Sequence, residues 1–162
     1  MSDFVHRRVM ELFGGGKLYC AETVLRVMAE AGGREHEDLV RMATGFCSGQ
    51  ARTCGQCGAV AGAMMGLGLY AGRADAGQSH EPVYALVKTF LARFSERYGS
   101  DNCAELLGCD LGTRMGQAKF KLKGLQKDCL EYSIFAAEVA LDLLRESGHL
   151  SEADDRRAQE RG

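Results

Sequence analysis

Residues 59–70 read Ala-Val-Ala-Gly-Ala-Met-Met-Gly-Leu-Gly-Leu-Tyr. The stretch carries no charge, and Gly62 and Gly66 are four positions apart, so they share one face of a helix. Glycine costs about 1 kcal/mol relative to alanine inside a helix, so these glycines need a structural reason. Close approach of a second helix backbone would supply it. We therefore predict a buried, Gly-rich central helix, with a Gly-rich strand or loop as the alternative.

Amphipathic patterns on both sides of this stretch indicate further helices. Val, Ile and Thr number 15 together, against 38 for Ala and Leu, so helix formers dominate. Helical spacing of apolar residues, with glycine at the ends, predicts helices over 4–12, about 18–31, 36–44, 82–98 and 128–147. Asn102 and Glu105 resemble the capping pair of another short helix. The pattern of residues 110–127 does not decide their secondary structure. We predict an all-α fold, a single-domain helical bundle of about six to seven helices over 1–150, followed by a charged, disordered tail over 151–162.

Charge and hydropathy exclude several classes of protein. The chain has 162 residues, with 20 Lys and Arg against 22 Asp and Glu, a net charge of −2. A nucleic-acid or anionic-membrane binder would need a dense basic face. The longest apolar run, 59–71, is shorter than the roughly 20 residues of a membrane span, and the first residues lack a signal-peptide core. We expect a cytoplasmic protein with no nucleic-acid or membrane partner.

Seven cysteines are the main departure from an average composition. An odd number in a chain long enough to bury its own core favours metal binding or thiol redox chemistry over a secreted disulfide scaffold. Small buried hydrophobes are the alternative. Helix N-termini favour the thiolate, the form that ligates metals and attacks disulfides. Four cysteines lie at or just before the first turn of a predicted helix: Cys20, Cys57, Cys103 and Cys129.

Cys54 and Cys57 form the only C-x-x-C pair. This spacing lets both sulfurs reach one metal, or form a disulfide that reopens easily. Gly58 follows the second cysteine where haem attachment needs histidine, and no second C-x-x-C supports a zinc ribbon. For thiol–disulfide exchange we expect Cys57, at a helix start, to be the catalytic nucleophile of lower pKa, with Cys54 as its catalytic resolving partner.

The order of the cysteines resembles that of the C-GCAxxG-C-C family, which is named redox-active from its cysteines. The matching segments are Tyr19–Leu25, Cys57–Ala63, Phe94–Ser100, Cys103–Gly108 and Cys129. The resemblance implies an all-α fold, and it extends to the non-haem part of split-Soret cytochromes, where an iron–sulfur site has been suggested. By this resemblance the metal-binding or cofactor-binding residues are Cys20, Cys57, Cys103 and Cys129. Cys47, Cys54 and Cys109 stand outside the family pattern.

Three functions remain as hypotheses. The first is a redox or electron-transfer protein whose four family cysteines bind an iron–sulfur cluster or another thiophilic metal. The second is a metal-free thiol–disulfide redox protein that uses Cys54 and Cys57, and the third is a non-catalytic helical structural or partner-binding domain. Either redox function calls for a redox partner protein, and a homodimer is an open alternative to a monomer. Whether the protein is an enzyme is left open.

Overall fold

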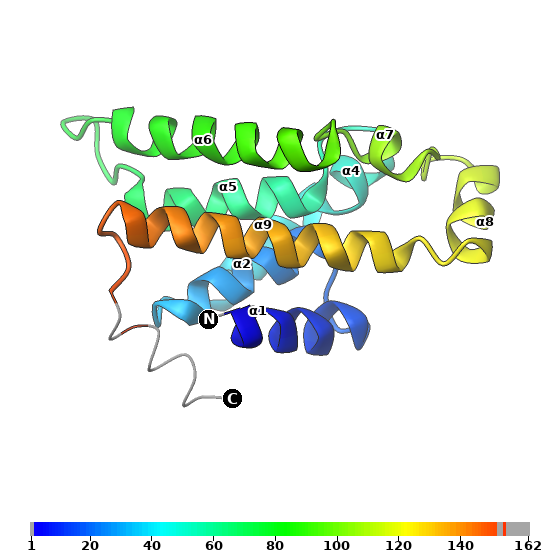
Figure 1. Ribbon diagram of the computed structural model, residues 1–162, viewed down its shortest axis with the longest axis horizontal. Coiled ribbons are helices and arrows are strands. Elements are labelled where there is room, and N and C mark those ends of the chain that lie inside the picture. Colours follow the sequence, from blue (N-terminus) through cyan, green and yellow to red (C-terminus); the bar gives the residue numbers. More distant parts are fainter. Residues whose placement is uncertain (1, 152–153, 155–162) are drawn as a thin grey trace.

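The computed structural model describes residues 2–151 and 154, and these form a helical bundle (Figure 1). No β-strand occurs among these residues, whose only β-type pairing is an isolated bridge between Gln56 and Asn102. The predicted all-α class is confirmed. The α-helices are α1 (Ser2–Val9), α2 (Cys20–Ala31), α3 (Glu37–Ala43), α4 (Cys47–Arg52), α5 (Gly58–Ala71), α6 (Glu81–Tyr98), α7 (Cys103–Leu107), α8 (Arg114–Leu122) and α9 (Gln126–Glu146).

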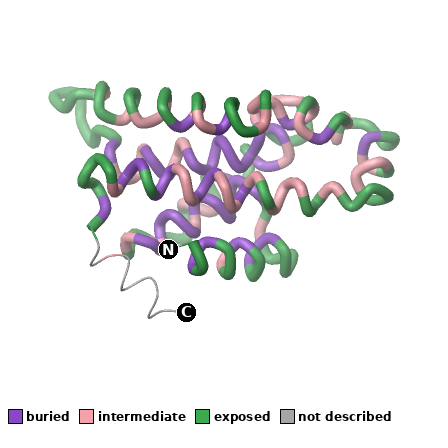
Figure 2. The backbone as a smooth tube through the Cα atoms, viewed as in Figure 1, coloured by how far each residue is buried: buried purple, intermediate pink, exposed green. Residues whose placement is uncertain are grey.

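Helix α5 is the predicted central helix, and it packs against α2, α6 and α9. Figure 2 shows that α5 and α2 are mostly buried, whereas α6 exposes its outer face. A Cβ atom on Gly62 would come within 2.6 Å of the Ala21 carbonyl oxygen in α2, and one on Gly66 would overlap the Met28 sulfur. These glycines therefore allow the close approach of a second helix that the sequence predicted, and the structure shows that this helix is α2.

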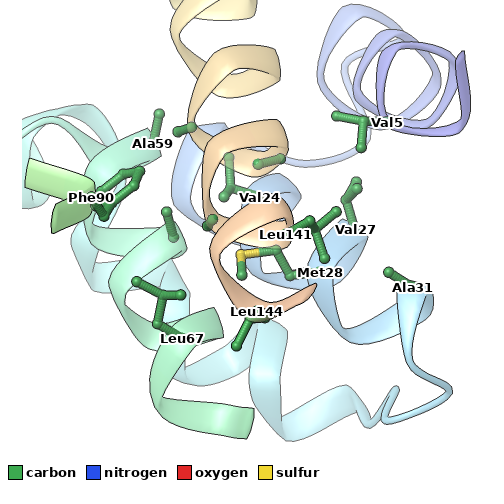
Figure 3. Packing of buried hydrophobic residues seen from close by; sticks show 14 of the residues in the cluster. Val5, Val24, Val27, Met28, Ala31, Ala59, Leu67, Phe90, Leu141 and Leu144 are labelled. Carbon is green, nitrogen blue, oxygen red and sulfur yellow. The ribbon is translucent and has the colours of Figure 1, made fainter. Parts of the chain in front are cut away.

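Apolar side chains from five helices fill the core (Figure 3). Helix α9 contributes Leu141 and Leu144, which pack with Met28 of α2 and Leu67 of α5. Phe90 on α6 is completely buried among them. Burial of about 25 cal/mol per Å² of apolar surface makes such clusters the main stabilising contribution to a fold. The core fixes the positions of α2, α5 and α9, whose N-terminal ends carry the cysteines discussed below.

Three segments differ in detail from the sequence predictions. The first helix continues from α1 into a π-helical turn, Met10–Gly14, and the third helix continues into a 3₁₀ turn, Thr44–Phe46. The ambiguous segment 110–127 contains α8, which projects from one end of the bundle (Figure 1).

The expected disordered tail, 151–162, lies outside the described residues except for Ser151 and Asp154. In the described part of the chain, no helix combines the length and apolar character needed to cross a membrane.

Candidate functional site

A cavity of about 350 Å³ opens at the end of the bundle where α4, α7 and α8 gather (Figure 1). Its volume falls in the range of small-ligand sites, which are commonly 300–1,000 Å³. Cys20, Cys57, Cys103 and Cys129 all line it. The structure thus brings together around one cavity the four cysteines that the family pattern singles out.

Each of these cysteines sits near the beginning of a helix. Cys20 and Cys103 are the first residues of α2 and α7, Cys57 is the N-cap of α5, and Cys129 lies in the first turn of α9. The four helices come from distant parts of the sequence, and the cysteines at their N-terminal ends line the same cavity. The cavity therefore depends on the packing of the bundle rather than on one local motif.

Hydrogen bonds between two loops fix Cys57 relative to Cys103. The backbone N–H of Cys57 donates to the Asp101 carbonyl oxygen at 2.6 Å, and the N–H of Cys103 donates to the Gly55 carbonyl oxygen at 3.0 Å. The Gln56 side-chain amide donates to the Asp101 carboxylate at 2.8 Å. This pairing joins the residues before α5 to the residues before α7.

Glycines make room for two of the sulfurs. A Cβ atom on Gly58 would overlap the Cys20 Sγ atom. A Cβ atom on Gly49 would come within 2.6 Å of the Cys103 Cβ atom and 3.1 Å of its Sγ atom. Real Cβ atoms do not approach other atoms as closely as 2.6 Å, so any larger residue at either position would have to displace a cysteine.

Helix α4 is wound in the left-handed sense, which the sequence analysis did not predict. Ser48, Gly49, Gln50 and Ala51 all have φ between 56° and 67° with positive ψ, and Arg52 follows with φ of 68°. Left-handed helical backbone costs roughly 1–2 kcal/mol for each residue other than glycine. Such strain concentrates at functional sites. Here the turn brings Ser48 and Arg52 to the cavity lining.

Burial favours the neutral form of three of the four cavity thiols, those of Cys57, Cys103 and Cys129. Burial raises the pKa of Cys57 to about 11, although the N–H groups of Ala59 and Val60 at the start of α5 act in the opposite direction. Burial raises the pKa of Cys103 to about 11 and raises the pKa of Cys129 further. The expectation that helix N-termini would yield thiolates is therefore wrong for these three residues, because desolvation outweighs the helix end.

The two cysteines of the C-x-x-C pair have different surroundings. Cys57 lines the cavity, whereas Cys54 does not. The thiol of Cys54 instead donates a hydrogen bond to Asp110. That bond raises the pKa of Cys54 and lowers the pKa of Asp110. Cys54 and Cys109 lie close enough to Cys103 to raise its pKa through charge repulsion. The role of Cys54 and Cys57 as a reactive dithiol stays a prediction.

Cys47 forms a contact that sequence reasoning missed. Its buried side chain is within hydrogen-bonding contact of Cys20, and its sulfur also accepts from the Glu22 backbone N–H in the first turn of α2. The two cysteines are far apart in the sequence, with no motif linking them. Only the packing of η2 and α4 against α2 could reveal the pair.

The rest of the lining combines two cations with polar and apolar groups. Arg52 and Lys121 supply the positive charges, and α7 and α8 supply much of the apolar wall. In the described part of the chain, no group of three or more His, Cys, Asp or Glu side chains is placed to hold a metal ion. The other lining residues are Phe13, Tyr19, Ser48, Gly58, Leu106, Leu107, Leu111, Gln117, Phe120, Gln126 and Tyr132.

Comparison with known proteins identifies a family. Searches of curated proteins and of solved structures each gave no match. A family described as "Putative redox-active protein (C_GCAxxG_C_C)" matches residues 18–143. That range begins before Cys20 and ends after Cys129, so it includes all four cysteines of the cavity lining. The chain belongs to this C_GCAxxG_C_C family.

Proposed function

We propose that this protein is an electron-transfer protein whose cavity holds an iron–sulfur cluster, with Cys20, Cys57, Cys103 and Cys129 as ligands. One observation carries the proposal: four thiols from four helices line a single cavity. Four cysteines are the usual ligand set of [2Fe–2S] and [4Fe–4S] clusters. A cluster supplies reversible one-electron chemistry, and the surrounding residues hold it and control its contact with water.

The arrangement of the thiols suits a group of several atoms better than a single ion. A structural zinc site needs its ligands about 2.0–2.3 Å from one point. In the described chain no such convergence of three side chains occurs. The ligands of a cluster bind different atoms of a larger group, and the cavity of about 350 Å³ that the four cysteines help to line supports this alternative.

The electrostatics of the cavity also fit a thiolate-bound cluster. Burial raises the pKa of Cys57 and of Cys103 to about 11, so these thiols carry protons near neutral pH. Iron would replace those protons, because a coordinated thiol is deprotonated by the charge of the metal. Four thiolates would leave excess negative charge, and Arg52 and Lys121 in the lining lie where they would offset part of it.

Metal-free thiol–disulfide exchange is the second candidate function. The observation that favours it is the presence of Cys54 and Cys109 as neighbours of Cys103, which gives the site more sulfurs than one cluster needs. The raised pKa of Cys57 weighs against it, because the attacking species in exchange is the thiolate.

Anaerobic purification and cluster reconstitution test the proposal. Wild-type protein should bind iron and inorganic sulfide together and show visible absorption. Cys57→Ser should lose both, whereas Cys54→Ser, the matched control from the same C-x-x-C pair, should retain them. Loss of iron in Cys54→Ser alone would mean that the ligand set is wrong. Colourless wild-type protein that binds neither iron nor sulfide would overturn the cluster, and a mixed disulfide trapped at Cys57 in Cys54→Ser would then support exchange.

A further inference from the structure

We propose that Cys20 and Cys47 form a reversible disulfide that withdraws Cys20 from the cavity. The pair is then a redox switch on the site. Its effect on cofactor binding rests on the proposed function, but formation of the disulfide does not. Cys47 lies outside both the family cysteine pattern and the cavity lining, so neither accounts for a second sulfur at this position.

The contact between the two sulfurs is the first observation behind this proposal. Cys20 and Cys47 are both buried, and they belong to one small cluster with Phe13, Ala21 and Leu25. Their side chains are in hydrogen-bonding contact, and the Glu22 backbone N–H reaches the Cys47 sulfur. The Cys47 sulfur therefore lies over the first turn of α2, the turn that begins with Cys20.

The backbone around the pair is the second observation. Cys20 is the first residue of α2, and Cys47 is an extended residue, with φ of −67° and ψ of 155°, at the junction of η2 and α4. Both residues thus lie at element ends, where a small movement disturbs little regular structure. The Cys20 sulfur already occupies the place that a Cβ atom would take on Gly58, so no side chain of α5 holds it away from Cys47.

The two thiols have different access to a reagent. Cys20 lines the cavity, so a small disulfide that enters the cavity meets its sulfur first. Attack by the Cys20 thiolate forms a mixed disulfide and releases one small thiol. The hydrogen bond with Cys20 is the largest cause that raises the pKa of Cys47, and it is lost once Cys20 carries the small thiol. The Cys47 sulfur then attacks the Cys20 sulfur, which forms the protein disulfide and releases the second small thiol with the Cys47 proton. The two protons leave the protein thiols, and two electrons reduce the small disulfide to two thiols; a dithiol reductant reverses both steps.

A sulfur that is bonded to another sulfur cannot act as a thiolate ligand. Oxidation would therefore leave Cys57, Cys103 and Cys129 in the cavity without their fourth partner. Reduction would restore the set. The protein would load its cofactor only under conditions reducing enough to open this bond.

Peptide mapping of the full chain tests the disulfide directly. Trypsin separates Cys20 in 18–26 from Cys47 in 42–52, and both from the Cys54 and Cys57 peptide, 53–73. After treatment with glutathione disulfide and alkylation of free thiols, wild-type protein should yield a linked 18–26 and 42–52 peptide that dithiothreitol separates. Cys47→Ser should instead carry glutathione on Cys20, and Cys54→Ser should give the wild-type link. Absence of the link in wild type, or a link from Cys20 to 53–73, would overturn the proposal.

Cofactor loading provides an independent measurement. Iron and sulfide uptake by pre-oxidised wild-type protein should be lost and then regained after reduction. Reduced Cys47→Ser should load like reduced wild type, because Cys47 is not itself a ligand. If the link forms and reduced protein loads, but oxidation leaves loading unchanged, the switch is overturned. If the link forms and reduced wild-type protein takes up no iron, the cluster fails while the disulfide stands.

Discussion

The Cys20 sulfur occupies the space that a Cβ atom would take on Gly58. The same Cβ atom would lie 3.0 Å from the Phe46 carbonyl oxygen, so the first residue of α5 is enclosed by α2 on one side and η2 on the other. The position of the thiol in the cavity therefore depends on the absence of a side chain in a different helix.

Replacing Gly58 with alanine should displace the Cys20 side chain. We expect the free energy of unfolding to fall by roughly 1–3 kcal/mol, because the added methyl group overpacks a buried site. Iron uptake should also decrease. The control is Gly68→Ala on the same helix, where a Cβ atom would meet no other atom within 4 Å. That change should stabilise the protein by up to about 1 kcal/mol through helix propensity. Equal effects of the two variants in urea denaturation would contradict the crowding at Gly58.

Gly62 and Gly66 should differ in their tolerance of alanine. A Cβ atom on Gly62 would approach the backbone oxygen of Ala21, which cannot move unless α2 moves. A Cβ atom on Gly66 would meet the side chain of Met28, which can change rotamer. We expect Gly62→Ala to cost about 1–3 kcal/mol and Gly66→Ala to cost less. Thermal or urea unfolding of both variants measures this order, and the reverse order would show that α2 yields more easily than Met28.

The fold class followed from local patterns. Helical spacing of apolar residues and glycine stops place the long helices because burial of one helix face leaves a repeating signal in the sequence. Gly62 and Gly66 indicated a close helix neighbour because two glycines on one helix face leave room for another backbone. The sequence did not show that this neighbour is α2.

The properties of the site depend on contacts between distant segments. The winding of α4 has no local signal, since Ser48, Gln50 and Ala51 are ordinary residues in a disfavoured conformation. The partnership of Cys20 and Cys47 arises only when α4 packs against α2. The N–H groups at the start of α5 do lower the pKa of Cys57, but desolvation, which depends on the whole fold, raises it more.

Alkaline pH should destabilise the protein through its buried thiols. Burial raises the pKa of Cys57 from the ordinary value of 9.0 to about 11. Below about pH 9 the thiol is protonated in both folded and unfolded chains, and the pH has no effect through this group. Between about pH 9 and 11 only the unfolded chain releases the proton, so stability falls as the pH rises, by roughly 2 kcal/mol for this residue.

Urea denaturation of wild type and Cys57→Ser near pH 8 and near pH 11 measures this contribution. The serine variant should lose less stability between the two pH values, because its hydroxyl does not titrate in that range. Cys103→Ser should show a change in the same direction, since burial also raises the pKa of Cys103 to about 11. Identical pH dependence in wild type and both variants would contradict the burial of these thiols.

Ala51 provides the clearest test of the left-handed turn beside the cavity. Its φ of 57° and ψ of 38° are strained for alanine, and its side chain is exposed, so it contributes little packing. Glycine adopts this conformation without the steric cost, so Ala51→Gly should stabilise the protein by about 0.5–1 kcal/mol after the entropy of the unfolded chain is included. The matched control is Ala85→Gly at an exposed position inside the right-handed helix α6, where the same chemical change should cost about 1 kcal/mol. Opposite signs for the two variants in urea denaturation would establish the handedness of the turn, and a loss of stability in both would show that Ala51 is not held in a left-handed conformation.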